Sequence, residues 1–350
     1  MIRFNNDYNH GAHPAILEAL VSTNDEAFEG YGLDPWCEAA AAEIVKYFDE
    51  ADRDRAQVHF LVGGTQTNFT VISALLRPWE SVVSPVSGHI NVHETGAVEH
   101  IGHKIEALPA ENGKITAAQV EKIACDFRDS TIPEHITEPK MVYLSFSTEV
   151  GSLYTLAELE AMRAVCDEYG LYLFIDGARL GYGLGSPECD MTIADIARLT
   201  DVFYIGGTKC GALFGEAVVV MNPALAPSFR SAIKQNGGML AKGWLLGLQF
   251  HTLFKDGLYF EITRAAIGKA IRIRDAFAAV GVPAYAESPT NQQFVILNEE
   301  QMRILGEKYI YEYEADLGEG RHAVRFCTSW STTDAEVDAL VADIEKLAAE

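Results

Sequence analysis

Short apolar runs alternate with amphipathic segments along the chain up to Gly243. Five runs are nearly continuous apolar stretches of strand length, at 57–62, 141–145, 171–175, 202–205 and 217–221. Three segments repeat apolar positions with the period of a helix, at 36–48, 65–76 and 156–169. Strands that are apolar on both faces are typical of a mostly parallel sheet with helices on either side. The pattern therefore predicts an α/β fold.

After Gly243, helical periodicity takes over and continues to Val280, where a Gly-Val-Pro segment at 281–283 ends it. The elements predicted in this part are a long helix, two short strands and a closing helix, at 259–279, 293–297, 323–327 and 334–348. We interpret them as a helical connector that leads into a smaller α+β domain. The predicted units are a large domain over 1–245, which includes an N-terminal arm, and a small C-terminal domain over 246–350.

The composition is that of a soluble globular protein, because 48% of the 350 residues are hydrophobic and 22% are charged. Acidic residues outnumber basic ones by 50 to 27, and the net charge is -23. Such a surface repels phosphate backbones and anionic lipid, which argues against nucleic-acid or membrane partners. The first residues lack the pattern of a signal peptide, and the six cysteines form no CxxC pair. We therefore expect free thiols and a cytoplasmic location.

An acidic residue ends the strand predicted at 171–175. Asp176 is followed at once by Gly-Ala-Arg179, and open α/β sheets bind ligands at the carboxyl ends of their strands. Such a carboxylate can pair with the protonated ring nitrogen of pyridoxal phosphate (PLP) and hold the ring as an electron sink. A helix cap or a surface turn is the alternative, and Asp176 alone does not separate the two.

A lysine follows another apolar strand. Lys209 lies among Gly206, Gly207 and Gly211, which suits the close approach of a flat cofactor better than a solvated position on a helix. A partly desolvated lysine has a lowered pKa and can form an imine with an aldehyde. Asp176 precedes Lys209 by 33 residues, about one strand–helix–strand excursion, so we expect the two side chains at the same cleft.

A third strand runs into a Gly-Gly-Thr turn at 63–65 that opens a helix. Free N–H groups and the helix dipole make such a turn an anion site suited to a cofactor phosphate, with Gly64, Thr65 and Gln66 as candidate ligands. The turn is not a Walker loop, because no Gly-Lys-Ser/Thr follows it. Glycine turns of this kind are also common for steric reasons alone.

Two further side chains are candidates for contact with cofactor or substrate. His89 can stack on the cofactor ring or move a proton, whereas His93 is more typical of a packed or solvated histidine. Their spacing does not predict a zinc site, because no third ligand is indicated. Arg325, on an apolar strand, can bind a substrate carboxylate through two hydrogen bonds, and an ion pair at a sheet edge is an equal alternative.

Taken together, these motifs resemble the aromatic amino acid beta-eliminating lyase/threonine aldolase family, and its low-specificity L-threonine aldolases in particular. The resemblance runs over essentially the whole chain. Its motifs are Asn6-Asp7, Tyr31-Gly-Leu-Asp-Pro, the turn at 64–68, His89, Asp176-Gly-Ala-Arg179, Lys209, Gly-Gly-Met at 237–239 and Arg325. It implies a fold type I PLP enzyme with a mostly parallel seven-stranded large domain. It also implies a homo-oligomer, a dimer or tetramer, in which Tyr31 reaches a neighbouring subunit's active site.

The sequence departs from the family pattern where the substrate is concerned. Asn6 stands where serine is usual, and Glu149 stands where the family has a histidine assigned to the substrate hydroxyl. By resemblance, the catalytic candidates are Lys209, His89 and Glu149. The candidates for holding the cofactor are Gly64, Thr65, Gln66, His89, Asp176, Arg179 and Lys209. The candidates for binding the substrate are Asn6, Tyr31, Arg179 and Arg325, and no metal site is expected.

The resemblance implies cleavage of L-threonine or a related β-hydroxy-α-amino acid to glycine and an aldehyde. Arg179 and Arg325 would orient the carboxylate, and His89, or Glu149 if it lies near the hydroxyl, would remove the hydroxyl proton. β-Elimination, transamination and racemisation use the same lysine and aspartate and stay open as alternatives. A nicotinamide dehydrogenase is disfavoured, because Asp176 precedes the glycines at 181–185 instead of following them. A non-catalytic acidic protein gives no reason for an aspartate and a lysine at strand ends.

Overall fold

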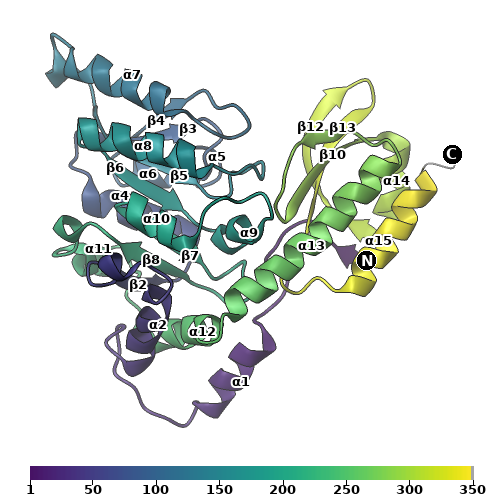
Figure 1. Ribbon diagram of the computed structural model, residues 1–350, viewed down its shortest axis with the longest axis horizontal. Coiled ribbons are helices and arrows are strands. Elements are labelled where there is room, and N and C mark those ends of the chain that lie inside the picture. Colours follow the sequence, from purple (N-terminus) through teal and green to yellow (C-terminus); the bar gives the residue numbers. More distant parts are fainter. Residues whose placement is uncertain (348–350) are drawn as a thin grey trace.

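A seven-stranded sheet forms the centre of the larger part of the molecule (Figure 1). In spatial order its strands are β2 (Gln57–Leu61), β8 (Glu216–Val220), β7 (Val202–Gly206), β6 (Tyr172–Asp176), β5 (Glu138–Ser145), β3 (Glu80–Pro85) and β4 (Lys104–Leu108). The five strands from β7 to β4 are parallel, and β8 is antiparallel to both of its neighbours. This computed structural model describes residues 1–347. The predicted α/β class with a mostly parallel sheet is confirmed.

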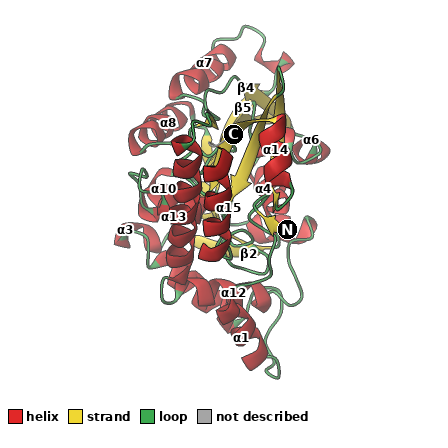
Figure 2. Cartoon of the chain, turned by 90° about the vertical axis from the view of Figure 1, so that its right-hand side faces the viewer, coloured by secondary structure: helices red, strands yellow, loops and turns green. Residues whose placement is uncertain are grey.

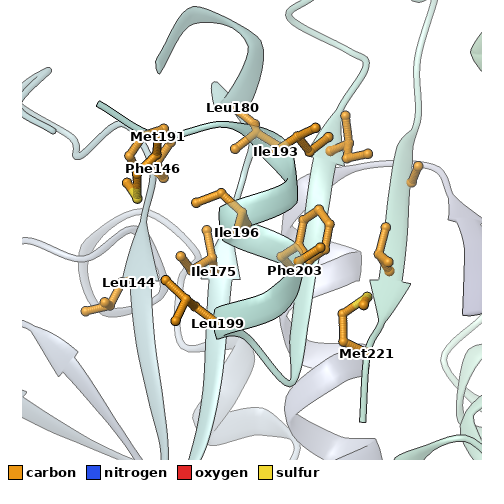
Figure 3. Close-up of a cluster of buried hydrophobic side chains, with 14 of the residues drawn as sticks. Leu144, Phe146, Ile175, Leu180, Met191, Ile193, Ile196, Leu199, Phe203 and Met221 are labelled. Carbon is orange, nitrogen blue, oxygen red and sulfur yellow. The ribbon is translucent and has the colours of Figure 1, made fainter. Parts of the chain in front are cut away.

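Helices cover both faces of this sheet, so alternate residues of each strand enter different cores. On β6, Leu173 and Ile175 belong to one core and Phe174 to the other. The helices over the first face include α2 (Pro35–Val45), α7 (Ala117–Arg128), α8 (Leu156–Tyr169) and α10 (Ile193–Leu199). Those over the second include α4 (Gly64–Leu75), α5 (His89–Val92), α6 (Ala97–His100) and α11 (Phe229–Gln235). Figure 3 shows α10 lying against Ile175 and Phe203.

Local caps determine how the chain enters β6. Thr155 starts α8 with a capping box, in which its hydroxyl accepts the Glu158 N–H and the Glu158 side chain accepts the Thr155 N–H. The helix ends at Gly170, whose φ of 64° lies in the left-handed region that glycine favours. The chain then turns directly into β6, which carries Asp176 at its end.

The smaller part of the molecule is built on a four-stranded sheet. Its order is β12 (Glu312–Gly318), β13 (Arg321–Cys327), β10 (Gln292–Asn298) and β9 (Ala284–Ala286), and α14 (Glu299–Gly306) follows β10. The 22-residue helix α13 (Leu258–Ala279) runs from the larger part to this sheet, with α15 (Asp334–Lys346) beside it (Figures 1 and 2). The predicted helix at 334–348 matches α15, and its last residue, Ala348, lies outside the described residues.

The first residues of the chain pack against the smaller part of the molecule, although they were predicted as an arm of the large domain. β1 (Ile2–Arg3) pairs with β11 (Tyr309–Ile310), and Phe4 is buried in the core of the smaller part. In contrast, α12 (Trp244–Phe254) packs on α2, and α1 (Pro14–Ser22) packs on α12. The domain boundary at residues 245 and 246 stays a prediction, and it falls inside α12.

The turns that follow β6 and β7 touch each other through glycines. The N–H of Gly206 donates to the Gly177 carbonyl at 2.9 Å. A Cβ on Gly177 would lie 1.8 Å from the Tyr204 carbonyl oxygen, and one on Gly206 would lie 2.3 Å from the Ala178 carbonyl oxygen. Glycine at both positions therefore allows the strand ends that carry Asp176 and Lys209 to meet.

We expect Gly177→Ala to destabilise the protein by about 3 kcal/mol, because the new Cβ would overlap backbone that cannot rotate away. Urea unfolding measures the change. Gly268→Ala is the matched control, since it lies in α13 with no atom within 4 Å of the added Cβ, and it should stabilise the protein by about 0.5–1 kcal/mol. Equal stability of Gly177→Ala and wild type would contradict the close approach.

Candidate active site

A carboxylate at the end of β6 is almost fully buried and accepts several hydrogen bonds. Asp176 is 4% exposed. Its oxygens accept hydrogen bonds from Tyr143 Oη at 2.6 Å, Tyr204 Oη at 2.5 Å, Asn68 Nδ2 at 3.0 Å and the Ala178 N–H at 3.0 Å. Burial works to raise the pKa of Asp176, but the nearby His89 ring and the tyrosine hydroxyls outweigh it and lower that pKa below its usual value. The carboxylate is therefore ionised at neutral pH.

Lys209 follows β7, the parallel neighbour of β6, so the 33-residue spacing brings amine and carboxylate to the same edge of the sheet. The backbone of Lys209 is held by a hydrogen bond from Tyr182 Oη to its carbonyl at 2.7 Å. Burial and the nearby Arg179 guanidinium lower the pKa of Lys209, while Asp7 and Asp176 act in the opposite direction. A lowered pKa increases the fraction of neutral amine, which is the form that attacks an aldehyde.

Arg179 binds the N-terminal arm. Its Nε and Nη2 donate to the two oxygens of Asp7 at 2.7 and 3.1 Å, and Asn291 Nδ2 donates to the same carboxylate at 3.0 Å. Burial alone would raise the pKa of Asp7, but Arg179 and Lys209 lower it to about 2. Asp7 takes the Nε and Nη2 donors of Arg179, and the expected role of Arg179 in binding a substrate carboxylate stays a prediction.

Glu149 is in direct contact with His89. Its Oε1 accepts hydrogen bonds from Ser145 Oγ at 2.6 Å and from the backbone N–H of His89 at 2.9 Å. Its Oε2 is buried and has no hydrogen-bond partner within residues 1–347. Burial raises the pKa of Glu149, which favours the protonated form. The His89 side chain is 37% exposed, and its Nδ1 lies 2.7 Å from Glu94 Oε1.

The N-terminus of α4 has backbone N–H groups that no helix carbonyl accepts. Gly63 caps this 12-residue helix without a side chain, and the first intrahelical bond runs from the Thr67 N–H to the Gly63 carbonyl. The N–H groups of Gly64, Thr65 and Gln66 therefore have no intrahelical acceptor, and their binding of an anion stays a prediction. A Cβ on Gly64 would lie 3.1 Å from Tyr204 Oη, so this turn adjoins the Asp176 carboxylate.

Arg325 has contacts at two of its three guanidinium nitrogens. Its Nη1 lies 3.2 Å from Glu314 Oε1 and its Nη2 donates to the Asn5 carbonyl at 3.3 Å. Its Nε is buried and has no partner in the described part of the chain. A guanidinium held from one side in this way can still bind an incoming carboxylate.

Asn6 and Tyr31 are the other two residues that were predicted to bind the substrate, and the structure shows what each of them contacts. Asn6 Oδ1 accepts the backbone N–H of Tyr8 at 3.0 Å, so this side chain supports the arm that carries Asp7. Tyr31 is 47% exposed, and its ring lies 4.7 Å from Lys234 Nζ. Arg230 donates to the Tyr31 carbonyl at 3.0 Å. Tyr31 thus lines a separate cavity of about 340 Å³, together with Arg230 and His59.

Several residues of the site were not assigned from the sequence. Tyr143 and Tyr204 lie inside apolar strands on either side of β6. A polar hydroxyl within an apolar strand was the sequence feature that could have identified them as residues of the site. Glu216 is the second case. Its carboxylate accepts hydrogen bonds from Thr208 Oγ1 at 2.8 Å and the Gly207 N–H at 3.1 Å, so it supports the turn before Lys209.

Two features are absent from residues 1–347. No group of three or more histidine, cysteine, aspartate or glutamate side chains in this part is arranged to hold a metal ion. None of the helices described has the length and the apolar character needed to cross a membrane.

Comparison with known proteins extends the similarity over both parts of the molecule. A family model for beta-eliminating lyases matches residues 11–310. The low specificity L-threonine aldolases of a Pseudomonas species and of Pseudomonas aeruginosa are 31% and 30% identical, over 98% of this chain and 96% of their own length. The structure of a threonine aldolase from Leishmania major is 43% identical, with a TM-score of 0.95 over 99% of this chain and 100% of its own.

The buried Glu216 makes stability depend on pH. Burial raises its pKa from an ordinary 4.5 to about 8. The folded protein therefore keeps a proton that the unfolded chain releases, and this contribution to stability is present below about pH 4.5 and is lost as the pH rises through about 8. We expect wild type to lose stability relative to Glu216→Gln between about pH 5 and pH 8.

Thermal unfolding at several pH values measures this difference. The exposed Glu188→Gln serves as a control for the loss of one formal negative charge, and its curve should run parallel to that of wild type. Parallel curves for wild type and Glu216→Gln would mean that Glu216 is ionised throughout.

Proposed function

The chain belongs to the beta-eliminating lyase family, and from this premise we propose that it is a PLP-dependent carbon–carbon lyase which cleaves L-threonine or a related β-hydroxy-α-amino acid. The products are glycine and an aldehyde. The observation that carries the proposal is the placement of two groups at one edge of the sheet: the buried, ionised Asp176 ends β6, and Lys209 follows the parallel neighbour β7, where Asp176 acts on its pKa. The names of the relatives favour aldol cleavage over β-elimination, transamination and racemisation.

The side chains present fit pyridoxal phosphate. Asp176 is the partner for a protonated pyridine nitrogen, because donors on both of its oxygens keep it ionised. Lys209 supplies the amine that carries the aldehyde, and the free N–H groups of Gly64, Thr65 and Gln66 supply the donors for the phosphate. When bound, the cofactor serves as an electron sink for the electrons that the cleaved Cα–Cβ bond releases.

The hydroxyl proton of the substrate must leave for the Cα–Cβ bond to break. His89 has a partly exposed ring whose Nδ1 is engaged by Glu94, so Nε2 is free to accept that proton. Glu149 holds the His89 backbone through Oε1 and leaves Oε2 unpaired. The unpaired oxygen is the alternative acceptor of the same hydroxyl proton, since a raised carboxyl pKa makes the carboxylate a stronger base. Whichever of the two groups takes the proton can return it to the cleaved Cα to complete glycine.

The substrate carboxylate binds Arg325, whose Nε is the unpaired guanidinium donor. Arg179 acts through Asp7, which it holds beside Lys209. Tyr31 lies apart from Lys209 within its own chain, at an exposed position next to Lys234. This position supports a homo-oligomer in which Tyr31 contributes to the site of a second copy.

Lys209→Ala should abolish both aldehyde production and the visible absorbance of protein purified with PLP, because no other amine would hold the cofactor covalently. Absorbance spectroscopy and borohydride reduction followed by mass spectrometry test this. The matched control is Lys122→Ala on the exposed face of α7, which should retain both. Persistence of the absorbance band in Lys209→Ala would defeat the assignment of this lysine.

Glu149→Gln should lower turnover by about tenfold to a hundredfold while the absorbance stays intact, because glutamine can still accept the bonds from Ser145 and His89 but cannot carry the proton. Product assays for aldehyde, ammonia and keto acid measure both the rate and the reaction type. Glu160→Gln, at a partly exposed position of α8, is the control. Unchanged turnover in Glu149→Gln would count against this role.

A further inference from the structure

Asn68 does not face the phosphate turn with which the sequence motif groups it. It lies on α4 and is fully buried, and its Nδ2 donates to two carboxylates, Asp176 Oδ2 at 3.0 Å and Glu94 Oε1 at 2.7 Å. An amide nitrogen carries two hydrogens, so both are used by these contacts. The Asn68 Oδ1 atom is buried and has no partner in residues 1–347.

Glu94 links Asn68 to the His89 ring. Its side chain is fully buried, and the same Oε1 atom that accepts the Asn68 bond lies 2.7 Å from His89 Nδ1. A carboxylate only accepts, so Nδ1 is the ring nitrogen that carries a hydrogen toward Glu94. An unbroken line of hydrogen bonds thus runs from Asp176 through Asn68 and Glu94 to His89.

We propose that Asn68 and Glu94 are positioning residues that join the His89 imidazole and the Asp176 carboxylate into one rigid unit. Glu94 fixes the tautomer with Nδ1–H, which leaves Nε2 as the acceptor that faces the substrate. Asn68 holds Glu94 in register with Asp176. This inference rests on the proposed function, since it assigns how the base of that reaction is oriented.

An amide is the side chain that this position requires. Two carboxylates contact one nitrogen here, and an aspartate in place of Asn68 would add a third acid to the same buried cluster. An alanine would leave both carboxylates with one donor fewer in a site where burial without a partner is costly. The other titratable groups that face the line are Tyr143 and Tyr204 at Asp176, and His93, Glu149 and Lys209 around the His89 end.

The test measures His89 directly in protein free of PLP, as well as activity in the loaded enzyme. Nitrogen-15 spectra should show the Nδ1–H tautomer in wild type and a mixture of tautomers in Asn68→Ala. The same variant should lose about tenfold to a hundredfold in kcat, with KM changed by less than about threefold. Thr70→Val is the matched control, because Thr70 is buried in the same helix and its hydroxyl has no partner within the described residues, and both measurements should match wild type.

Glu94→Gln provides a second route if Asn68→Ala does not fold. It keeps the size of the side chain and removes the charge that selects the tautomer, so the same mixture is expected. A pure Nδ1–H tautomer in the folded variants would overturn the inference, as would an equal loss of kcat in Thr70→Val. If the wild type released no aldehyde from β-hydroxy-α-amino acids, the proposed function would be wrong. The His89 spectra of PLP-free protein do not depend on that reaction, so they would still test the positioning by Asn68 and Glu94.

Discussion

A carboxylate buried at the edge of a protein core must either take up a proton or be surrounded by donors, and Asp176 is surrounded by donors. Tyr143 comes from β5, Tyr204 from β7 and Asn68 from α4, while the Ala178 N–H comes from the turn after β6. The donors meet only when β5, β6 and β7 are neighbours and α4 covers the right face of the sheet. The ionisation of one side chain therefore depends on the order of the strands, and the close glycine contact between the turns after β6 and β7 keeps Lys209 near it.

The N-terminal arm links the two parts of the molecule at this site. β1 is a strand partner of β11 in the smaller part, yet Asp7, only a few residues later, is bound by Arg179 of the larger part and by Asn291 of the smaller one. Arg325 reaches the same arm through the Asn5 carbonyl. The residue proposed to bind the substrate carboxylate is thereby held in place relative to Lys209, so the arm sets the geometry between cofactor and substrate groups.

The contacts also divide the two arginines that the family resemblance had grouped together. Arg179 already has a carboxylate partner in Asp7, whereas Arg325 keeps an unpaired Nε. Glu149 stands where the family has a histidine, but it is not displaced from the chemistry, because it contacts His89 and leaves one oxygen free. At the proposed site, His89 therefore follows the family pattern, and Glu149 is the departure from it that adjoins His89.

The sequence by itself determined the fold class and predicted Asp176 and Lys209 at one edge of the sheet, because apolar strand runs and the residues at their ends are local features. It did not reveal β3 or β4, since β3 buries Glu80, Ser81 and Ser84 and β4 has no fully buried residue, so neither has an apolar run. Only the tertiary structure decided which polar groups meet. Asn68, Glu94 and the two tyrosines are far apart along the chain, and their hydrogen bonds exist because sheet order and helix packing bring them together.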